Sequence, residues 1–469
     1  MLLDLQAAAG HLPGPLHGRL TDALREAIRE GRLRAGSLLP SSRVLAAELG
    51  CSRWVVTQAY AQLAAEGYLD GQIGSGTRVR MTGAETPASG AVPAPSGPAR
   101  TAIDLAPGLP DLRAFPVTRW VTAVRAAAAA MPVADLGYPD PAGHPVLRDV
   151  LSGYLTRVRG ARANPAHLTV CGSVRAGIAR LCGALREVGC QAIAVENPGW
   201  HRLREQIASS GLTVVPVPVD DQGLRADLLD QHPEAGAVVV SPAHQFPVGT
   251  VLSAPRRAAL LAWARRTGGL IIEDDYDAEY RYDRRPVGAL QGADPGAVAL
   301  LGSVSKTLSP ALGIGWMVTP PRWTALLRSA HMAAPPVLDQ LAFAEFTRAG
   351  SYDRHLRAGR QRYRQRRDAL VRALAAELPQ ARVAGASAGL HLVALLDGLD
   401  AGAIQRRALA LGVRVANLDT YRAGTGFGGE PGLVLGYGNL ADHQLGAAVS
   451  LLAQAVITSS GASPGTAFV

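Results

Sequence analysis

Lysine is used only once in this chain. Lysine and arginine together number 47, and the single lysine among them is Lys306. An amine can form an imine with an aldehyde, whereas a guanidinium is essentially never deprotonated. Chance survival of one lysine in an arginine-rich composition is the alternative explanation. Lys306 ends the stretch Gly302-Ser-Val-Ser-Lys306, which follows the apolar run Ala297–Leu301. It therefore falls just past a predicted buried parallel strand, where such a strand would present active groups, and this position favours imine chemistry.

A second apolar run, Leu270–Ile272, is followed by an acidic and phenolic cluster. Pyridoxal 5'-phosphate (PLP) is an aldehyde that needs a carboxylate against its ring nitrogen and a donor near its phenolic oxygen. Asp274 and Tyr276 fit these two roles, and we expect Glu273 and Asp275 to point to the other side of the strand. A metal or surface cluster is the alternative interpretation of these acidic residues.

Further polar or aromatic residues follow other predicted strands. Trp200 could lie on the cofactor ring, although a tryptophan at a strand end usually belongs to a core. The turn at Gly172 and Ser173 opens a helix whose free amide groups could hold a phosphate. The hydroxyls of Ser303 and Ser305 have a spacing that could also reach a phosphate. Together these features predict a PLP site at the carboxyl ends of several strands.

The composition is that of a globular protein with two or three domains. Hydrophobic residues make up 48% of the 469 residues and charged residues 18%, and no apolar run reaches membrane-spanning length. The start carries an acidic residue where a signal peptide would place positive charge. The four cysteines show neither metal-ligand spacing nor clustering with histidines. We therefore expect a cytoplasmic protein with free thiols, no metal site and no membrane contact.

The order of elements predicts how the chain is divided. Helical periodicity comes first, a Pro/Gly/Ala/Ser-rich stretch follows, and apolar strands then alternate with helices in the α/β pattern of a mostly parallel sheet. The small C-terminal domain is expected to be α+β, and a strongly basic stretch within it, 354–367, is better explained as a solvated helix face than as a DNA contact. The predicted parts are a head (1–80), a flexible linker (81–100), a body (101–458, with a large domain over about 101–335 and a small one over about 336–458) and a disordered tail (459–469).

The head has the pattern of a winged helix-turn-helix. We expect helices over Leu20–Arg29, Val44–Leu49 and Arg53–Glu66, the second capped by Ser41 or Ser42 and the third by Ser52. A glycine turn joins the last two, so the third helix can enter the major groove of duplex DNA, and a Gly-rich hairpin follows as a wing. We expect Trp54 and Tyr60 to pack in the core, and the alternative is that they stack on or touch bases. The candidate DNA-contacting residues are Arg43, Ser52, Arg53, Thr57, Gln58, Gly76 and Arg78.

The run from LPSSR to GSGTRV resembles the winged-helix head of the GntR family along its whole length. Stretches such as VENPGWHRLR, SPAHQFPVGT, IIEDDYDAEYRY and GSVSKTLSPALGIGWMV resemble fold type I aminotransferases, specifically the MocR/GabR-type regulators fused to GntR heads. The resemblance implies that Lys306 is the Schiff-base lysine, that Asp274 and Tyr276 serve the ring nitrogen and the phenolic oxygen, and that Trp200 stacks on the ring. It also implies that Arg202 contacts an effector and that Tyr138 reaches a neighbouring subunit's phosphate in a head-to-tail homodimer.

Three positions depart from the family pattern. Gly313 replaces an arginine that commonly anchors the phosphate, Val174 and Arg175 replace a glutamine pair, and Asn439 stands where aminotransferases clamp the substrate carboxylate. We therefore favour a regulator that binds operator DNA, holds PLP and responds to PLP, an amine or an amino acid. The alternatives are a regulator whose body has lost PLP and serves as dimeriser and ligand pocket, and a working aminotransferase with an accessory head.

Overall fold

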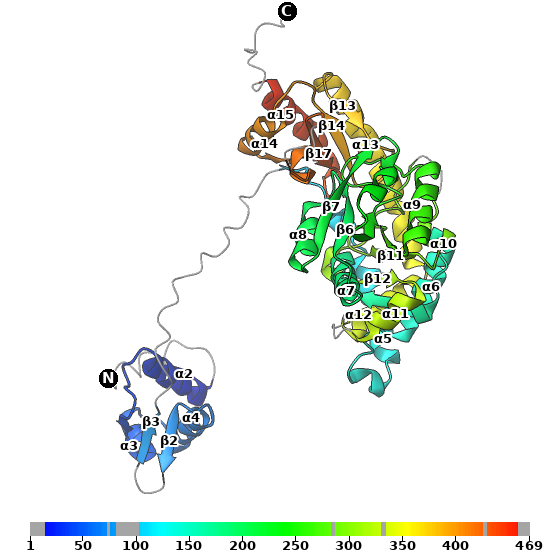
Figure 1. Cartoon of the computed structure of the whole chain (residues 1–469). Coiled ribbons are helices and arrows are strands. Elements are labelled where there is room, and N and C mark those ends of the chain that lie inside the picture. The colour runs from blue at the N-terminus through cyan, green and yellow to red at the C-terminus, as the bar shows by residue number, and fades with distance from the viewer. Residues whose placement is uncertain are drawn as a thin grey trace, which may run out of the picture. The chain divides into compact units, whose positions relative to one another are not determined.

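The computed structural model describes residues 15–72, 76–80, 103–282, 287–329, 334–424 and 429–457. The chain splits into two compact units, residues 1–97 and 98–469, called here the head and the body (Figure 1). The predicted linker (81–100) and tail (459–469) lie outside the described residues, as does the tip of the predicted wing (73–75).

The described residues of the head form three helices and a three-stranded antiparallel sheet in the order β1–β3–β2. The first described helix begins four residues earlier than the apolar periodicity predicts, because Pro15 takes the N-cap position with the extended backbone that suits a helix start. Leu24, Val56 and Leu63 are fully buried between the helices. The elements are α2 (Leu16–Arg29), β1 (Leu38–Leu39), α3 (Ser42–Glu48), α4 (Arg53–Ala65), β2 (Leu69–Gln72) and β3 (Gly76–Val79).

Two local expectations for the head are wrong. Ser52 occupies the N-cap position of α4, but its side chain makes no capping hydrogen bond. Trp54 is 60% exposed and only meets the edge of His17, with 5.5 Å between ring centroids. Tyr60 is buried and donates its hydroxyl to the carbonyl of Pro40 at 2.9 Å. Trp54 therefore lies on the surface of the head, whereas Tyr60 belongs to its core.

An eight-stranded sheet organises the body, in the order β5–β12–β11–β10–β9–β6–β7–β8. The five strands from β11 to β7 are parallel, whereas β12 and β8 pair antiparallel with their neighbours. The strands are β5 (Leu168–Cys171), β6 (Ala192–Asn197), β7 (Thr213–Asp220), β8 (Gly223–Leu224), β9 (Ala235–Val240), β10 (Leu270–Asp274), β11 (Val298–Ser303) and β12 (Gly315–Val318).

Helices cover both faces of this sheet, as uninterrupted apolar strands require. Alternate residues of β6 separate onto the two faces: Ile193 and Val195 join one core cluster with α7, α8 and α11, and Ala192 and Ala194 join another with α9. In Figure 1, α8 and α9 accordingly flank β6 and β7 on opposite sides. The helices are α5 (Val117–Ala130), α6 (Pro145–Arg159), α7 (Val174–Glu187), α8 (His201–Ser209), α9 (Ala254–Thr267), α10 (Leu290–Ala293), α11 (Pro321–Ser329) and α12 (Val337–Arg348).

A smaller antiparallel sheet, in the order β13–β14–β17–β16, forms the other part of the body. The first described strand of the body, β4, pairs in parallel with β15, so the start of the described body lies against its C-terminal part. The strands are β4 (Ile103–Asp104), β13 (Arg382–Ala384), β14 (His391–Leu395), β15 (Val413–Arg414), β16 (Ala416–Asn417) and β17 (Gly432–Gly436), and the helices are α13 (Ser351–Glu377), α14 (Ala401–Ala410) and α15 (Leu445–Ile457).

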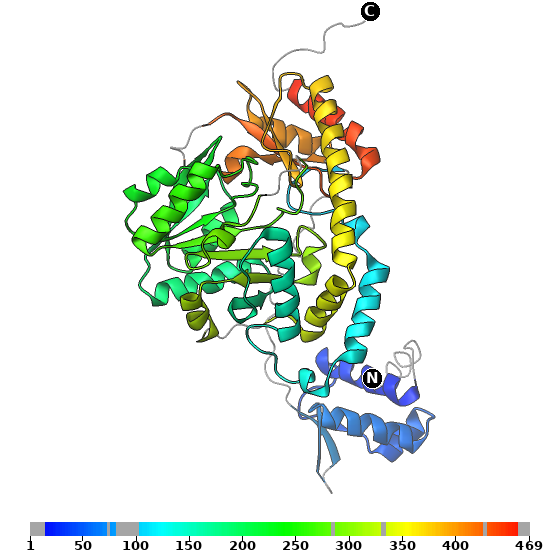
Figure 2. The same ribbon diagram turned by 90° about the vertical axis from the view of Figure 1, so that its right-hand side faces the viewer.

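Helix α13 contains the basic stretch and runs from α12 to α15 (Figure 2). Arg354, Arg357 and Arg364 are exposed. Arg366 is buried and forms ion pairs with Asp111 at 2.8 Å and with Asp442 at 2.6 Å. The stretch is therefore partly structural and partly a solvated face. In the described part of the chain, no helix is both long enough and apolar enough to cross a membrane.

Candidate cofactor site and DNA-binding face

A cavity of about 470 Å³ lies in the body where β6, β10 and β11 end. Parallel strands place their carboxyl ends at one edge of a sheet, so residues far apart in the sequence meet there. The cavity unites most of the residues predicted for the cofactor and effector. These are Ser173, Trp200, Arg202, Asp274, Tyr276, Ser303, Ser305 and Lys306.

Lys306 extends into this cavity and donates its Nζ hydrogen to the carbonyl oxygen of Gly108 at 2.5 Å. Burial lowers the pKa of the amine, while the carboxylates of Asp274 and Asp277 act in the opposite direction. A lowered pKa increases the fraction of neutral amine, which is the nucleophilic form. The chain's single lysine therefore lies in the cavity with an increased fraction of neutral amine.

Asp274 has an oxygen without a partner at the cavity wall. Its Oδ1 is shielded from solvent and makes no hydrogen bond with any described residue. Burial raises the pKa of Asp274 to about 7, and the negative charges of Asp275 and Asp277 add to the effect. A protonated ring nitrogen would supply the missing donor and compensate the charge, so this residue fits PLP.

The neighbouring acidic residues serve the fold instead. Glu273 accepts hydrogen bonds from the backbone N–H groups of Leu290 and Gln291, at 2.9 and 3.0 Å, where α10 begins. Asp275 forms a buried ion pair with Arg159 at 2.7 Å. Neither lines the cavity. Successive side chains of an extended chain point to opposite sides. Asp274 and Tyr276 accordingly line the cavity, whereas Glu273 and Asp275 do not.

Hydroxyl groups surround the side of the cavity expected to hold the phosphate. Ser173 is the N-cap of α7 and accepts a hydrogen bond from the Ala176 N–H at 3.1 Å. Ser303 accepts one from the Ser305 N–H at 3.3 Å. Gly172 does not itself line the cavity but precedes Ser173 in the turn. A helix N-terminus with nearby hydroxyls attracts an anion, which fits a phosphate group.

The departures at Gly313 and Arg175 lie close to this region. Gly313 has φ +58°, and a Cβ built on it would have the Gly172 carbonyl as its nearest neighbour, at 4.0 Å. There is therefore room for a side chain. Arg175 lines the cavity, lies 5.9 Å from the centroid of the Trp200 ring and donates to Gln206 at 3.1 Å. It is the cationic group nearest in sequence to the phosphate turn.

Several cavity residues had no role assigned from the sequence. Phe246, His391 and Tyr421 form the wall opposite the sheet. Arg204 donates to the carbonyls of Tyr421 and Arg422, at 2.9 and 3.1 Å, and so ties that wall to α8. The motif SPAHQFPVGT was a signal for Phe246, whereas no local pattern indicated the others.

Arg202 is the arginine of the cavity with the most freedom to bind a ligand. Its side chain is exposed, and it makes no hydrogen bond or ion pair with the described residues. Asn439 does not line the cavity: its Oδ1 accepts from the Leu112 N–H at 3.3 Å, and its carbonyl accepts from Arg113. The described contacts of Asn439 are thus with the 112–113 segment, and the interpretation of position 439 as a missing carboxylate clamp stays a prediction.

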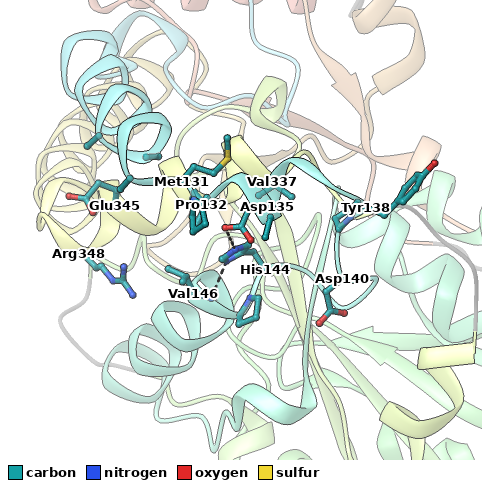
Figure 3. A pocket seen from close by; sticks show the side chains of 17 residues that line it. Met131, Pro132, Asp135, Tyr138, Asp140, His144, Val146, Val337, Glu345 and Arg348 are labelled. Atoms are coloured by element: carbon teal, nitrogen blue, oxygen red, sulfur yellow. Dashed lines mark hydrogen bonds and ion pairs between the residues drawn. The ribbon is translucent and has the colours of Figure 1, made fainter.

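Tyr138 lies away from this cavity. It is fully exposed and stands on the rim of a second cavity of about 560 Å³, where it points away from the paired His144 and Asp135 (Figure 3). Within one chain, the structure does not bring Tyr138 to Lys306. Val133 and Leu136, beside it in the sequence, are 83% and 71% exposed. Such a cluster of exposed apolar side chains is typical of a protein–protein contact.

All the residues predicted to contact DNA are exposed on the head. Arg53 begins α4 and donates to the Ser42 hydroxyl at 3.3 Å, and Thr57 is one turn further along this helix. Arg78, on β3 beside the wing, donates to the Gly36 carbonyl at 3.2 Å. A helix with an exposed basic N-terminus, followed by a hairpin, is the arrangement that enters a major groove.

Comparisons with known proteins agree with both parts of the chain. Residues 16–79 match the bacterial regulatory proteins of the gntR family, and residues 100–428 match aminotransferase class I and II. The crystal structure of an archaeal alanine:glyoxylate aminotransferase superimposes with a TM-score of 0.70, at 22% identity, over 76% of this chain and 91% of that chain. LysN, an α-aminoadipate aminotransferase from Thermus thermophilus, does so with 0.68, at 23% identity, over 76% and 93%.

Relatives with the same two parts extend over nearly the whole chain. The HTH-type pyridoxine biosynthesis transcriptional regulator PdxR of Corynebacterium glutamicum is 34% identical over 94% of this chain and 96% of its own length. The probable rhizopine catabolism regulatory protein MocR of Rhizobium meliloti is 31% identical over 96% of both. The chain therefore belongs to the MocR/PdxR-type family of transcriptional regulators, in which a GntR winged-helix head precedes an aminotransferase class I and II body.

Proposed function

We propose that this regulator binds operator DNA through its head and holds PLP on Lys306 in its body. The observation that carries this proposal is the position of the chain's single lysine, in one cavity with the unpartnered Oδ1 of Asp274. Elsewhere in the chain arginine is the long basic residue, so retention of a lysine here points to imine chemistry. The relative PdxR is named as a regulator of pyridoxine biosynthesis, which supports the same cofactor.

When bound, PLP would supply an aldehyde carbon and an electron-withdrawing ring. Asp274 would accept the hydrogen of the ring nitrogen, Tyr276 would donate to the phenolic oxygen, and Trp200 would lie on the ring. Ser173, at the N-terminus of α7, and the hydroxyls of Ser303 and Ser305 would hold the phosphate.

We propose that the protein works as a head-to-tail homodimer in which Tyr138 reaches the phosphate of the neighbouring subunit. The support is that Tyr138, Val133 and Leu136 are exposed together, as is typical of residues in a protein–protein contact. Two heads in a dimer would bind paired half-sites of an operator.

The effector that fits best is PLP itself or an amine. Of the three arginines lining the cavity, Arg204 is bound to backbone carbonyls and Arg175 to Gln206, which leaves Arg202 to contact a ligand. A single exposed guanidinium is sufficient to recognise an effector. Transamination needs a substrate whose carboxylate is held in a fixed position, which one exposed arginine does less well. A regulator without PLP is the second candidate, and the observation that favours it is Gly313, which leaves the phosphate without an arginine beside the 172–173 turn.

Operator selection with the full-length protein tests the proposal. Duplex fragments retained from a random pool would be sequenced, and their affinity measured with and without added PLP. We expect a paired motif and an affinity that changes when PLP is present. If the retained duplexes show no preferred sequence, the DNA-binding assignment is wrong. If a motif emerges but PLP leaves its affinity unchanged and is not retained, the cofactor-free candidate is correct.

Replacement of Arg53 by alanine is expected to weaken operator binding by about 1–3 kcal/mol. The reason is its exposed position at the start of α4, where a guanidinium reaches a phosphate or a guanine. Fluorescence anisotropy at several salt concentrations would measure the loss. If Arg53 contacts a phosphate, the slope of log affinity against log salt concentration should be shallower by about one in R53A. If it contacts a base, R53A should instead discriminate less between operator sequences. Arg32, exposed in the head and paired with Glu30, is a matched control, and an equal loss in R32A would refute a specific role for Arg53.

Introduction of the missing arginine, Gly313→Arg, is expected to tighten PLP binding about tenfold. The space beside Gly172 admits the side chain, and a charge-assisted hydrogen bond to phosphate contributes about 1.5–3 kcal/mol. The left-handed backbone at residue 313 costs the fold about 1–2 kcal/mol in the free and the PLP-bound protein alike, so it lowers the free energy of unfolding and not the affinity for PLP. Equilibrium dialysis with PLP would measure the change, and Gly313→Ala separates the backbone cost from the new contact. Equal affinity of G313R and G313A would contradict a phosphate site at this turn.

A further inference from the structure

Behind Tyr276 lies a buried group of polar side chains for which the proposed function has given no role. His244 Nδ1 lies 2.9 Å from Asp277 Oδ2 and 3.1 Å from Oδ1, and the Tyr276 hydroxyl lies 3.0 Å from the same nitrogen. His244 is 3% exposed and Asp277 1%. The backbone closes over them, since a Cβ at Gly389 would overlap both side chains. The group is therefore built into the fold.

The number of hydrogens on these groups determines which of them donates and which accepts. Nδ1 carries at most one hydrogen, which forms its strongest bond with the Asp277 carboxylate because that bond is charge-assisted. Nδ1 then has no lone pair to accept the Tyr276 hydrogen. The phenolic oxygen of Tyr276 can share the N–H as an acceptor, while its own hydrogen remains available to an acceptor in the cavity. Asp277 thus fixes the tautomer of His244, and His244 fixes the direction of the Tyr276 hydroxyl.

The surrounding charges favour the same state. Burial raises the pKa of Tyr276 well above its ordinary value, and neighbouring carboxylates add to this effect, so the phenol keeps its hydrogen. Burial lowers the pKa of His391 to about 3, so this neighbour of His244, 5.0 Å away between ring centroids, is neutral. The titratable groups that face Tyr276 and His244 are Glu196, Asp274, Asp277, Lys306, His391 and Tyr437.

We propose that His244 and Asp277 are positioning residues that keep the Tyr276 hydroxyl a hydrogen-bond donor toward the cavity. This inference rests on the proposed function, in which that donor meets the phenolic oxygen of PLP. A donor at this oxygen withdraws electron density from it and weakens its attraction for a proton on the nitrogen that joins PLP to Lys306. The pair thereby sets the pH at which this nitrogen is protonated.

The test is a pH titration of the visible absorption band of PLP attached to Lys306 in the full-length protein. In His244→Asn, Tyr276 is free to turn its hydroxyl toward Asp277, and the donor to PLP is lost. We expect the midpoint of the titration to rise by up to about one pH unit, the size of one hydrogen bond. Tyr276→Phe is expected to raise it at least as much. In the Tyr276→Phe background, His244→Asn should add no further shift, because the two residues act through one hydroxyl.

A matched control exists in the second cavity. His144 also pairs with a carboxylate, since its Nε2 lies 3.1 Å from Asp135 Oδ2 (Figure 3), and His144→Asn should leave the midpoint unchanged. Thermal melting would show whether each variant folds, and His244→Gln provides a second variant if H244N does not.

The outcomes separate this inference from the proposed function. A wild-type protein that never shows the band refutes the proposed attachment of PLP, and the positioning role with it. A wild-type band with the same midpoint in H244N refutes the positioning role alone, as does a further shift in the double variant. His244, Asp277 and His391 also have ligand atoms within 4.8 Å of one another. A stoichiometric zinc ion that is present in wild type and lost in H244N would likewise overturn the hydrogen-bond assignment, because the metal would occupy the histidine nitrogens.

Discussion

Replacement of Lys306 by alanine is expected to abolish the covalent retention of PLP. The amine is the single lysine side chain available for an imine, and its lowered pKa favours the neutral nucleophile. After incubation with PLP, reduction with borohydride and desalting, the wild type should keep one equivalent of cofactor and Lys306→Ala none. Peptide mass mapping has a simple background, because the other primary amine of the chain is its N-terminus. Cofactor trapped at the N-terminus alone would show that Lys306 does not have this role.

Lys306→Arg separates the chemistry from the charge. It restores a cation near Asp274 and Asp277 but cannot form an imine. We expect it to retain no PLP after reduction, while its operator affinity without PLP stays close to that of the wild type. An operator affinity that responds to PLP equally in K306R and wild type would place the regulatory site elsewhere in the chain.

The parts of the site that were predicted from sequence share one property. Asp274 is the last residue of β10, and Trp200 and Lys306 each lie three residues beyond the last residue of β6 and β11. A parallel sheet converts this local pattern into a shared location, because its strands end at one edge. The same argument excluded Glu273 and Asp275, since the alternation of side chains is a local property too.

The residues that were missed come together only through long-range packing. His391 lies on β14, in the smaller sheet, and Tyr421 in the turn after β16, so neither is near a strand end of the large sheet in the sequence. His244 occurs within a recognised motif, but its role depends on a distance to Asp277 across 33 residues. The contacts of Asn439 with Leu112 and Arg113 are long-range too, and no local pattern indicated them. Ser52 and Trp54 show that residue type alone does not determine a cap or a buried ring.

The trade-off between stability and cofactor binding can be measured at Asp274. Burial raises the pKa of Asp274 from 3.8 to about 7, so the folded chain holds this proton more tightly than the unfolded chain. Raising the pH from about 4 to 7 therefore destabilises the PLP-free fold through this group, and the penalty persists above pH 7. Asp274→Asn cannot ionise, and it is expected to raise the free energy of unfolding by up to about 4 kcal/mol at pH 8 and by less than about 2 kcal/mol at pH 5. The first value is an upper limit, because the cavity admits solvent.

The same variant should bind PLP about 10–100-fold more weakly, since a charge-assisted hydrogen bond to the ring nitrogen is lost. Denaturant melts at both pH values and equilibrium dialysis would check these two effects. The adjacent Asp275 is the matched control: Asp275→Asn weakens the buried ion pair with Arg159 and should destabilise the protein at both pH values, by up to about 3–5 kcal/mol. If D274N destabilises the PLP-free protein at pH 8 as D275N does, Asp274 is a structural residue and the assignment of its free oxygen to a cofactor is wrong.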